Sequence, residues 1–313
     1  MTSRAPIVGV CVATFRRPPG LAALLAALAN QRFPAEALPR VLVFVTDNDP
    51  EGSARSTIDR ARRDHDLEIH DRVETRRGVV HARNASVAAA LETGVDFVVF
   101  VDDDESPHAD WLATLLATQR ASGAPIVAGP VVEVLDDALP AWYRDAGFYR
   151  PPERADGAPA PYAACGNSLF AAALLEAVSG PFDPRFNVSG GEDVFLSLTL
   201  MAAGAAIVWS PQALVDTHVP ADRARLRHVA RRHHIGAANY TRAEGLVAGW
   251  RPTRVVTGAG RVARGLVLVA TGAVRLAPPR MALGVVVAAE GLGVISGALG
   301  GGAGRAWWSA DDR

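Results

Sequence analysis

Short apolar runs alternate with helix-like segments over the first 135 residues of the chain. The runs are rich in β-branched and aromatic residues, which favours buried strands, and the segments between them repeat apolar residues at helical spacing. The expected strands are residues 7–14, 41–46, 67–73, 97–101 and 126–134. The expected helices are residues 21–31, 54–64, 79–91 and 111–120. This alternation predicts βαβ units, and therefore an α/β domain whose mainly parallel sheet is flanked by helices.

The alternation stops after about residue 135. A stretch rich in proline, glycine and aromatic residues covers residues 140–162. A loop of this length is usually functional or disordered, and we expect a mobile loop on the substrate side of the domain. Further on, Gly190 and Gly191 precede Glu192 and Asp193 at the start of another expected helix. The dipole at a helix N-terminus favours carboxylates there.

Residues 221–313 are expected to form a helical extension of a nucleotide-binding domain of residues 1–220. Residues 221–281 contain twelve arginines and two acids. The apolar segments 255–276 and 281–299 are interrupted by arginine, glutamate and glycine, so neither is an unbroken membrane span. We expect interfacial helices whose arginines are attracted to anionic headgroups. Packing on the catalytic domain or on another subunit is the alternative.

Composition agrees with a folded protein of the cytoplasm. The 313 residues are 49% hydrophobic, which is enough for a large core. The two cysteines offer neither metal-ligand spacing nor a disulfide framework. The apolar stretch near the start of the chain lacks a signal-peptide cleavage pattern. We expect no nucleic acid partner.

Acidic and polar clusters follow several of the expected strands. Thr14 ends the first, residues 47–49 follow the second, and residues 102–105 form an acidic run after the fourth. Ligands of open α/β sheets bind at the carboxyl ends of strands, and adjacent carboxylates repel each other unless a cation or solvent separates them. Magnesium and manganese prefer oxygen ligands and bridge carboxylates to substrate phosphates. The pattern therefore predicts a divalent metal with a nucleotide diphosphate as its other ligand.

Five motifs, in this order and spacing, resemble the family 2 glycosyltransferases of GT-A fold over about residues 6–245. They are residues 12–17, 45–49, 77–84, 101–105 and 191–193. Within that family, residues 139–142, 166–170 and 182–186 are most similar to bacterial exopolysaccharide enzymes of the succinoglycan-biosynthesis type. The resemblance implies a Rossmann-like GT-A domain, followed here by the helical extension.

The resemblance also implies roles for individual residues. Those assigned to the nucleotide are Thr14, Arg16, Asp47, Arg77, Arg83, Asn84, Asp102 and Asp103. Asp104 and Asp102 match the outer positions of the DXD motif that holds Mn²⁺ or Mg²⁺, and His218 is a candidate late ligand. Asn84 and His218 have structural roles as their alternatives. Glu105 is expected to face solvent or the acceptor.

On the acceptor side, Asp193 matches the general base of the family and Glu192 its neighbour. The base removes the proton of the acceptor hydroxyl as that oxygen attacks the anomeric carbon, and the metal stabilises charge on the leaving diphosphate. The resemblance implies inversion at that carbon. Trp142 is expected either to stack on an acceptor sugar or to fasten the long loop to the domain.

The predicted function is an inverting, metal-dependent glycosyltransferase. It moves a hexose from a nucleotide-diphosphate sugar, expected to be a UDP-sugar, to a lipid-linked or polysaccharide acceptor in cell-envelope or exopolysaccharide synthesis. We expect it in the cytoplasm at the inner face of the cell membrane. Two alternatives stay open: a sugar nucleotidyltransferase, whose phosphate loop residues 14–20 match poorly, and a non-catalytic GT-A scaffold subunit of a polysaccharide assembly complex.

Overall fold

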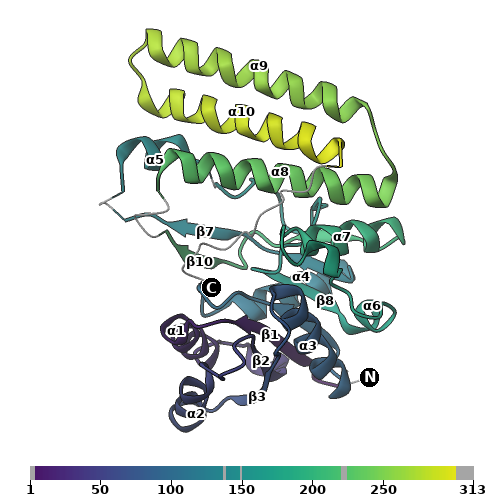
Figure 1. Ribbon diagram of the computed structural model, residues 1–313. Helices are drawn as coiled ribbons and strands as arrows, with labels where there is room; N and C mark the ends of the chain where they lie inside the picture. The colour runs from purple at the N-terminus through teal and green to yellow at the C-terminus, as the bar shows by residue number, and fades with distance from the viewer. Residues whose placement is uncertain (1–3, 137–138, 149, 220–223, 301–313) are drawn as a thin grey trace. The chain divides into compact units, whose positions relative to one another are not determined.

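The computed structural model describes residues 4–136, 139–148, 150–219 and 224–300 (Figure 1). The chain divides into two compact units. The first comprises Met1–Val132, Pro151–Asn187 and Thr199–Thr217, and the second Glu133–Arg150, Val188–Leu198 and His218–Arg313. The domain boundary expected between residues 220 and 221 lies among residues 220–223, outside the described part of the chain.

A seven-stranded sheet forms the centre of the first unit, in the order β3-β2-β1-β4-β8-β6-β9. Its strands are β1 Ile7–Thr14, β2 Arg40–Asp47, β3 Glu68–Val73, β4 Phe97–Phe100, β6 Ile126–Ala128, β8 Ser168–Ala171 and β9 Ile207–Trp209. Strands β1 to β4 pair in parallel, as do β6 and β9, whereas β8 is antiparallel to β4 and β6. The mainly parallel α/β sheet predicted from the sequence is confirmed.

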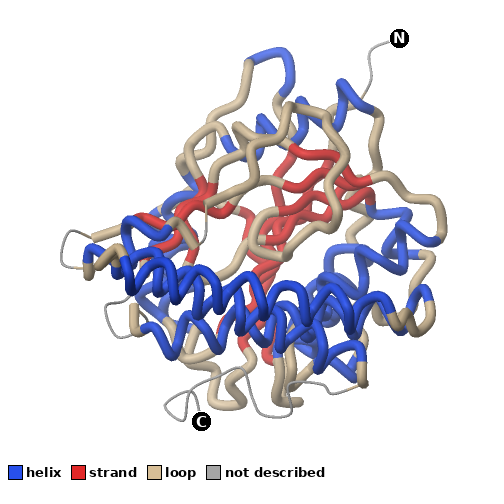
Figure 2. Tube along the Cα trace, turned by 90° about the horizontal axis from the view of Figure 1, so that it is seen from above, coloured by secondary structure: helices blue, strands red, loops and turns tan. Residues whose placement is uncertain are grey.

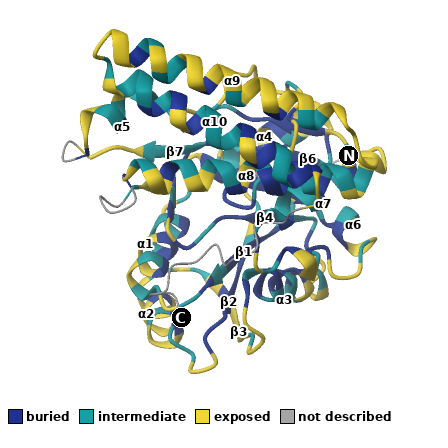
Figure 3. Cartoon of the chain, turned by 45° about the horizontal axis from the view of Figure 1, so that its top comes forward, coloured by how far each residue is buried: buried dark blue, intermediate teal, exposed yellow. Residues whose placement is uncertain are grey.

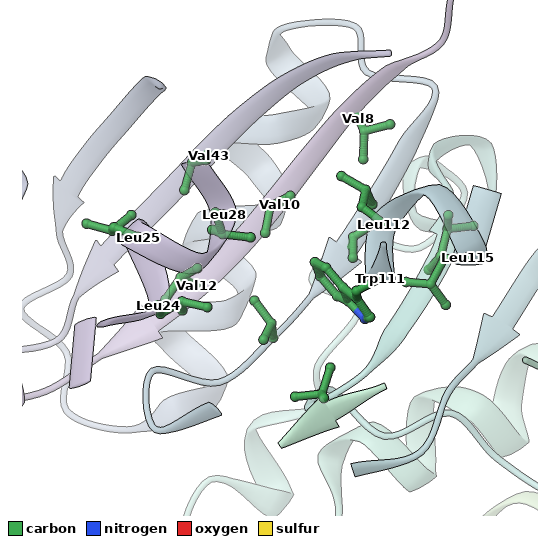
Figure 4. Packing of buried hydrophobic residues seen from close by; sticks show 14 of the residues in the cluster. Val8, Val10, Val12, Leu24, Leu25, Leu28, Val43, Trp111, Leu112 and Leu115 are labelled. Carbon is green, nitrogen blue, oxygen red and sulfur yellow. The ribbon is translucent and has the colours of Figure 1, made fainter. Parts of the chain in front are cut away.

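Helices cover both faces of this sheet because successive residues of a strand point to opposite sides. Val8, Val10 and Val12 of β1 pack with α1 and α4 in one apolar cluster (Figure 4). Gly9 lies on the other face, where a Cβ would stand 3.2 Å from Ala90 of α3. The helices of this unit are α1 Pro18–Ala29, α2 Arg55–Asp64, α3 Val79–Glu92, α4 Trp111–Ser122 and α6 Ala172–Glu176, with short 3₁₀ turns at Ala35–Ala37 and Pro184–Phe186.

One strand prediction is wrong. Residues 126–134 were expected as a single strand, but they form β6 and a separate strand β7, Val131–Val134, in a different sheet. The break falls at Pro130, which has no N–H to donate to a ladder. The second sheet has the order β5-β10-β7, with β5 at Glu105–Pro107 and β10 at Val215–His218.

The second unit is mainly helical. Its helices are α5 Ala141–Ala146, α8 Leu226–Ala248, α9 Thr253–Val274 and α10 Pro278–Ala298, and α7, Glu192–Ala202, begins in it. Helix α10 packs against α5 and lies between α8 and α9 (Figure 1). Figure 2 shows the helices from above, in blue. Glycines form the α9–α10 seam: a Cβ on Gly265 would lie 2.6 Å from the carbonyl oxygen of Gly284. The two backbones therefore approach more closely than any larger residue permits.

Helices α9 and α10 are long and apolar enough to cross a membrane, judged by length and composition alone. Their apolar windows have mean hydropathies of 1.2 and 1.8. They differ in burial, because 17% of the α9 window is buried and 44% of the α10 window. Figure 3 shows α9 largely in the colour of exposed residues. Apolar helices of this length also occur in the cores of other proteins, where they are mostly buried.

Candidate active site

The acidic run begins where β4 ends, in the middle of the large sheet. Its members alternate in exposure: the side chains of Asp102 and Asp104 are 39% and 43% exposed, whereas Asp103 and Glu105 are buried. The paired strand β1 ends at Thr14, which is in register with Asp47 of β2. The carboxyl ends of three adjacent strands thus meet at one edge of the sheet, as expected for a ligand site of this fold class.

Asp103 points inward, toward β1 and the start of α1. Its Oδ2 accepts a hydrogen bond of 2.7 Å from the Thr14 hydroxyl, and its Oδ1 one of 3.1 Å from Arg17. Burial raises the pKa of Asp103 to about 6, although both contacts oppose the rise. At Gly20 a Cβ would lie 2.5 Å from the Asp103 carbonyl oxygen, so the start of α1 packs directly on the acidic run.

Asp102 and Asp104 carry the carboxylates that are open to solvent. Arg83 donates to Asp102 Oδ1 at 2.7 Å, and Arg17 donates to Asp104 Oδ2 at 2.8 Å. Within the described residues there is no group of three or more His, Cys, Asp or Glu that could hold a metal. Two carboxylates completed by water and diphosphate oxygens are nevertheless how Mg²⁺ is usually bound. The donor set therefore fits Mg²⁺ or Mn²⁺.

Glu105 differs from its expectation. It was expected to face solvent or the acceptor, but it is only 7% exposed, and its Oε2 accepts the backbone N–H of Asp102 at 2.9 Å. Burial raises its pKa well above the ordinary value, and the nearby charge of Asp102 adds to the rise. Gly166 packs so closely on this carboxyl group that a side chain there would overlap it. Glu105 therefore helps to shape the loop that carries Asp102.

Asp47, the expected nucleotide residue at the end of β2, and Asn48 after it are held by a dense set of hydrogen bonds. Asp47 is buried, and its carboxylate accepts the N–H groups of Asp49 and Ala54 at 3.0 and 2.7 Å. Asn48 donates to the carbonyl oxygens of Glu74 and Arg76. It also accepts the N–H of Gly78 at 2.7 Å. The β2 end is thereby tied to the loop that precedes α3.

Aromatic and cationic groups gather beside this loop. The guanidinium carbon of Arg77 lies 3.5 Å from the ring centroid of Phe15, and that of Arg16 lies 5.1 Å from it. Arg16 also forms an ion pair with Asp49, with Nε at 3.0 Å from Oδ2. This contact lowers the pKa of Asp49 below its ordinary value. Phe15 and Asp49 were not predicted as site residues, although both lie in the motifs of the resemblance.

Gly78 turns the chain into α3 with a φ of +128°, a conformation that suits glycine. The amide of Asn187 fills the space where a side chain on Gly78 would lie, and it donates to the Arg77 carbonyl at 3.0 Å. Asn187 thus fixes the corner that carries Arg77. It lies 110 positions away along the chain, so nothing in the local pattern indicates this contact.

Asn84 and Asn167 have their polar groups engaged by protein. The Asn84 amide donates to the Phe182 carbonyl at 2.8 Å and accepts the Phe182 N–H at 2.9 Å, which is the arrangement its structural alternative requires. Asn167, buried in the motif of residues 166–170, accepts from the Trp111 indole at 2.8 Å and donates to the carbonyl oxygens of Pro130 and Ala213. The contacts of Asn84 do not test its predicted nucleotide role.

The acceptor-side candidates belong to the second unit. Gly190 and Gly191 have φ values of +75° and +88°, and α7 starts immediately afterwards at Glu192. Glu192 is buried and Asp193 is half-buried, with its Oδ1 accepting the Val194 N–H at 2.7 Å. Asn239 of α8 donates to the Ser189 carbonyl at 2.5 Å and so holds the loop that leads to these acids.

Trp142 and His218 take different positions in that unit. Trp142 is half-buried in α5 and makes edge-to-face contacts with Tyr143 and Phe148, at centroid distances of 5.8 and 6.0 Å. This packing agrees with the alternative in which Trp142 fastens the long loop. His218 is exposed at the end of β10. The ligand role of His218 and the acceptor role of Trp142 stay predictions.

Comparison with known proteins identifies the family. The sequence model of glycosyl transferase family 2 matches residues 9–179. The succinoglycan biosynthesis protein ExoM of Rhizobium meliloti is 35% identical over 305 residues, which cover 94% of this chain and 92% of that protein. The chain belongs to glycosyl transferase family 2. It is therefore an enzyme of the glycosyltransferase class, and this membership favours that reading over the nucleotidyltransferase and scaffold alternatives.

Other similar proteins are more distant. The pre-mycofactocin glycosyltransferase of Mycobacterium tuberculosis is 28% identical over 222 residues, which cover 63% of this chain and 44% of that protein. Among solved structures, the mannosyltransferase PcManGT from Pyrobaculum calidifontis, in complex with GDP-Man and Mn²⁺, gives a TM-score of 0.59 at 22% identity, over 92% of this chain and 87% of that one. S. aureus TarS 1–349 in complex with UDP gives 0.53 at 17%, over 92% and 90%. These structures confirm the GT-A fold.

Proposed function

We propose that this family 2 enzyme transfers a hexose, with inversion, from a UDP-sugar to a lipid-linked or polysaccharide acceptor in exopolysaccharide synthesis. The observation that carries the proposal is the pair of exposed carboxylates, Asp102 and Asp104, at the sheet edge where Thr14 and Asp47 also end their strands. The similarity to a succinoglycan biosynthesis protein supports the pathway class. Related folds solved with UDP, with UDP-GlcNAc and with GDP-Man support a nucleotide-diphosphate sugar as donor, and the choice of UDP is the finer part of the proposal.

On the donor side, Asp102 and Asp104 would hold Mn²⁺ or Mg²⁺, with His218 as a further candidate ligand. The bound cation supplies positive charge that stabilises the diphosphate as it leaves. Arg83 holds the Asp102 carboxylate at 2.7 Å, and Thr14 holds that of Asp103. Arg77 lies exposed over Phe15, where its guanidinium can donate to phosphate or to a base carbonyl.

On the acceptor side, Asp193 would act as the general base. Its carboxylate takes the proton of the acceptor hydroxyl while that oxygen forms a bond to the anomeric carbon. The bond from this carbon to the diphosphate oxygen breaks, and the nucleoside diphosphate leaves with the bonding electrons. Attack opposite the leaving group inverts the configuration. Glu192 and Trp142 are proposed to contact the acceptor.

We also infer that the enzyme works at the inner face of the cell membrane. A lipid-linked acceptor, as proposed above, would lie in a membrane, and α9 and α10 provide two long apolar helices. The twelve arginines between residues 221 and 281 would favour an anionic surface. The proposed contact between the enzyme and the membrane is peripheral, so the helices lie in the membrane surface and do not span the bilayer.

The deciding experiment compares Asp193→Asn with Asp145→Asn, a change at an exposed aspartate of α5 in the same unit. Asp193→Asn should lower the transfer rate by about 10²- to 10⁴-fold, the usual contribution of general-base catalysis, while UDP binding persists. Asp145→Asn should leave both unchanged. Nucleoside diphosphate release from UDP-, GDP- and dTDP-sugars with Mn²⁺ would give the rates, and calorimetry would give UDP binding. Near-normal transfer by Asp193→Asn would remove the base assignment.

The same assay tests the broader proposal. Release of UDP together with a glycosylated product of opposite anomeric configuration, observed by NMR, is the expected result. Release of pyrophosphate would instead indicate nucleotidyl transfer. The absence of turnover with every nucleotide sugar and acceptor would contradict the proposed reaction.

A further inference from the structure

Helix α9 has two opposite apolar faces, and only one of them is covered. Gly258, Gly265 and Gly272 are buried against α10. Half a turn away, residues 256, 260, 263, 267, 270 and 274 share one side of the helix because they recur at intervals of three and four. All six are valine, alanine or glycine. Val256, Val267 and Val274 are 74%, 60% and 86% exposed, so this outward face has no protein partner among the described residues.

Positive charge accompanies this uncovered face. Residues 245–289 contain six arginines and no acidic residue. Arg264 and Arg275 lie on one flank of the outward face, and both are exposed. An uncovered apolar face with cations along its edge matches the chemistry of an anionic bilayer.

A pocket lies at the end of this helix layer, where α8 turns into α9 and α10 ends. Its volume is about 510 Å³, and its walls include Arg242, Arg251, Arg254, Glu244 and Trp250. The lining holds these three arginines and one acid, Glu244, which forms an ion pair with Arg254. Trp250 is 64% exposed and Leu299, also in the lining, is 69% exposed. The pocket thus combines guanidinium groups with an apolar rim.

We propose that this pocket binds the phosphate headgroup of an anionic phospholipid while the outward face of α9 lies in the bilayer surface. Guanidinium groups bind phosphate oxygens with directed, charge-assisted hydrogen bonds. Tryptophan favours the level of the headgroups, where its ring meets acyl chains and its N–H meets water. The proposal rests on the membrane location given under the proposed function and adds the lipid class, the residues and the orientation.

The pocket also has a connection to the acceptor side of the enzyme. Arg242, in its wall, donates to the Ser189 hydroxyl at 3.4 Å. Ser189 belongs to the loop of residues 189–191 that starts α7 with Glu192 and Asp193. A phosphate bound by Arg242 therefore lies one side chain from the loop that carries the proposed base. This places lipid contact and acceptor capture in the same unit.

The test measures binding of the full chain to sedimented vesicles, either of phosphatidylcholine alone or with added phosphatidylglycerol. Arg251→Gln should weaken binding to the anionic vesicles about fivefold, as expected for one arginine at such a surface. Arg60→Gln, at an exposed arginine of α2 in the first unit, should not. Val267→Asp should abolish binding to both kinds of vesicle, whereas Val73→Asp, at a 48% exposed valine of β3, should leave it intact.

Several results would overturn the proposal. One is an equal loss of vesicle binding in Arg251→Gln and Arg60→Gln. Another is wild-type chain that stays in the supernatant instead of sedimenting with the vesicles. A third is light scattering that shows a dimer in the wild type and its dissociation by Val267→Asp. Inorganic phosphate that releases the chain from the sedimented vesicles as effectively as added free vesicles do would assign the pocket to a free anion instead. Sugar transfer to a soluble acceptor, measured without vesicles, should be unchanged in both variants. If the wild-type chain transfers no sugar, the proposed reaction is contradicted, but the result of the vesicle binding test is not affected.

Discussion

The guanidinium group of Arg17 lies 2.8 Å from Asp104, the carboxylate that the resemblance assigns to the metal. The same Nη1 is 3.1 Å from Asp103, so a single cationic side chain joins two acids of the run. Arg17 immediately precedes α1, and its carbonyl accepts the N–H of Leu21 in the first turn. A divalent cation at Asp104 would compete with the Arg17 guanidinium group, which already neutralises that carboxylate.

Arg17→Gln is therefore expected to strengthen Mn²⁺ binding in the absence of nucleotide. An ion pair this exposed contributes roughly 0.2–1 kcal/mol, which corresponds to a gain of up to about fivefold in affinity. Electron paramagnetic resonance of free Mn²⁺ gives the affinity directly. Arg16→Gln is the matched control, because Arg16 pairs with Asp49 and not with the acidic run. Weaker Mn²⁺ binding by Arg17→Gln would show that Arg17 supports the metal site rather than competing with the ion.

The pKa of Asp103 leads to a prediction about stability and pH. Burial raises this pKa from 3.8 to about 6, so between these values the folded chain binds more protons than the unfolded chain. The free energy of unfolding should therefore fall as pH rises through that window, by an amount on the order of 2 kcal/mol. Asp103→Asn, whose amide oxygen can still accept from Thr14, should show a smaller fall. Chemical denaturation between pH 4 and about 7 in the presence of a chelator would measure both.

Much of the sheet could be predicted because local pattern decides it. β1 spans the residues expected from its run of eight, since an apolar segment bounded by polar residues has few other ways to be buried. The acidic run was placed correctly at the end of β4, because that placement needs only the strand and its direction. The split between β6 and β7 was not predicted. It depends on Pro130 and on Asn167, which donates to the Pro130 carbonyl from 37 positions away.

The local sequence pattern also did not predict which acids of residues 102–105 are buried and which are exposed. Nothing in the letters of residues 102–105 distinguishes a buried carboxyl group from an exposed one. Glu105 is buried because Gly166 leaves room for it and the Asp102 N–H binds it, and both facts depend on tertiary contacts. Asn187 beneath Gly78 is a similar case. Residue type and spacing indicate which groups gather at a site, whereas long-range packing decides which of them face the ligand.

The two cysteines should not react with thiol reagents in the folded protein. Cys11 lies in β1 and is 3% exposed, and burial raises the pKa of its thiol far above the ordinary value. Cys165 is buried as well. Because the thiolate is the reactive form, a thiol reagent should label neither residue in the native chain and both after denaturation. Mass spectrometry of the labelled protein would check this, and modification of Cys11 under native conditions would contradict the burial of β1.

The seam between α9 and α10 can be tested with one substitution at two positions of the same helix. Gly265 faces α10, where a Cβ would lie 2.6 Å from the Gly284 carbonyl oxygen and 2.6 Å from the Ala288 nitrogen. Gly265→Ala should therefore force the helices apart and destabilise their packing by about 1–3 kcal/mol. Gly260 faces outward, and apart from the neighbouring backbone of α9 itself no atom lies within 4 Å of its Cβ position. Gly260→Ala should instead stabilise α9 by up to about 1 kcal/mol, because alanine loses less backbone entropy in a helix.

Amide hydrogen exchange is the suitable measurement for this pair, because it reports the opening of α9 and α10 separately from the unfolding of the first unit. The expected pattern is faster exchange across both helices in Gly265→Ala and slower exchange in Gly260→Ala. Equal protection in the two variants would mean that the seam does not hold the helices together. The distinction matters for the membrane proposal, because a bilayer can receive the outward face of α9 only while the glycine face remains fastened to α10.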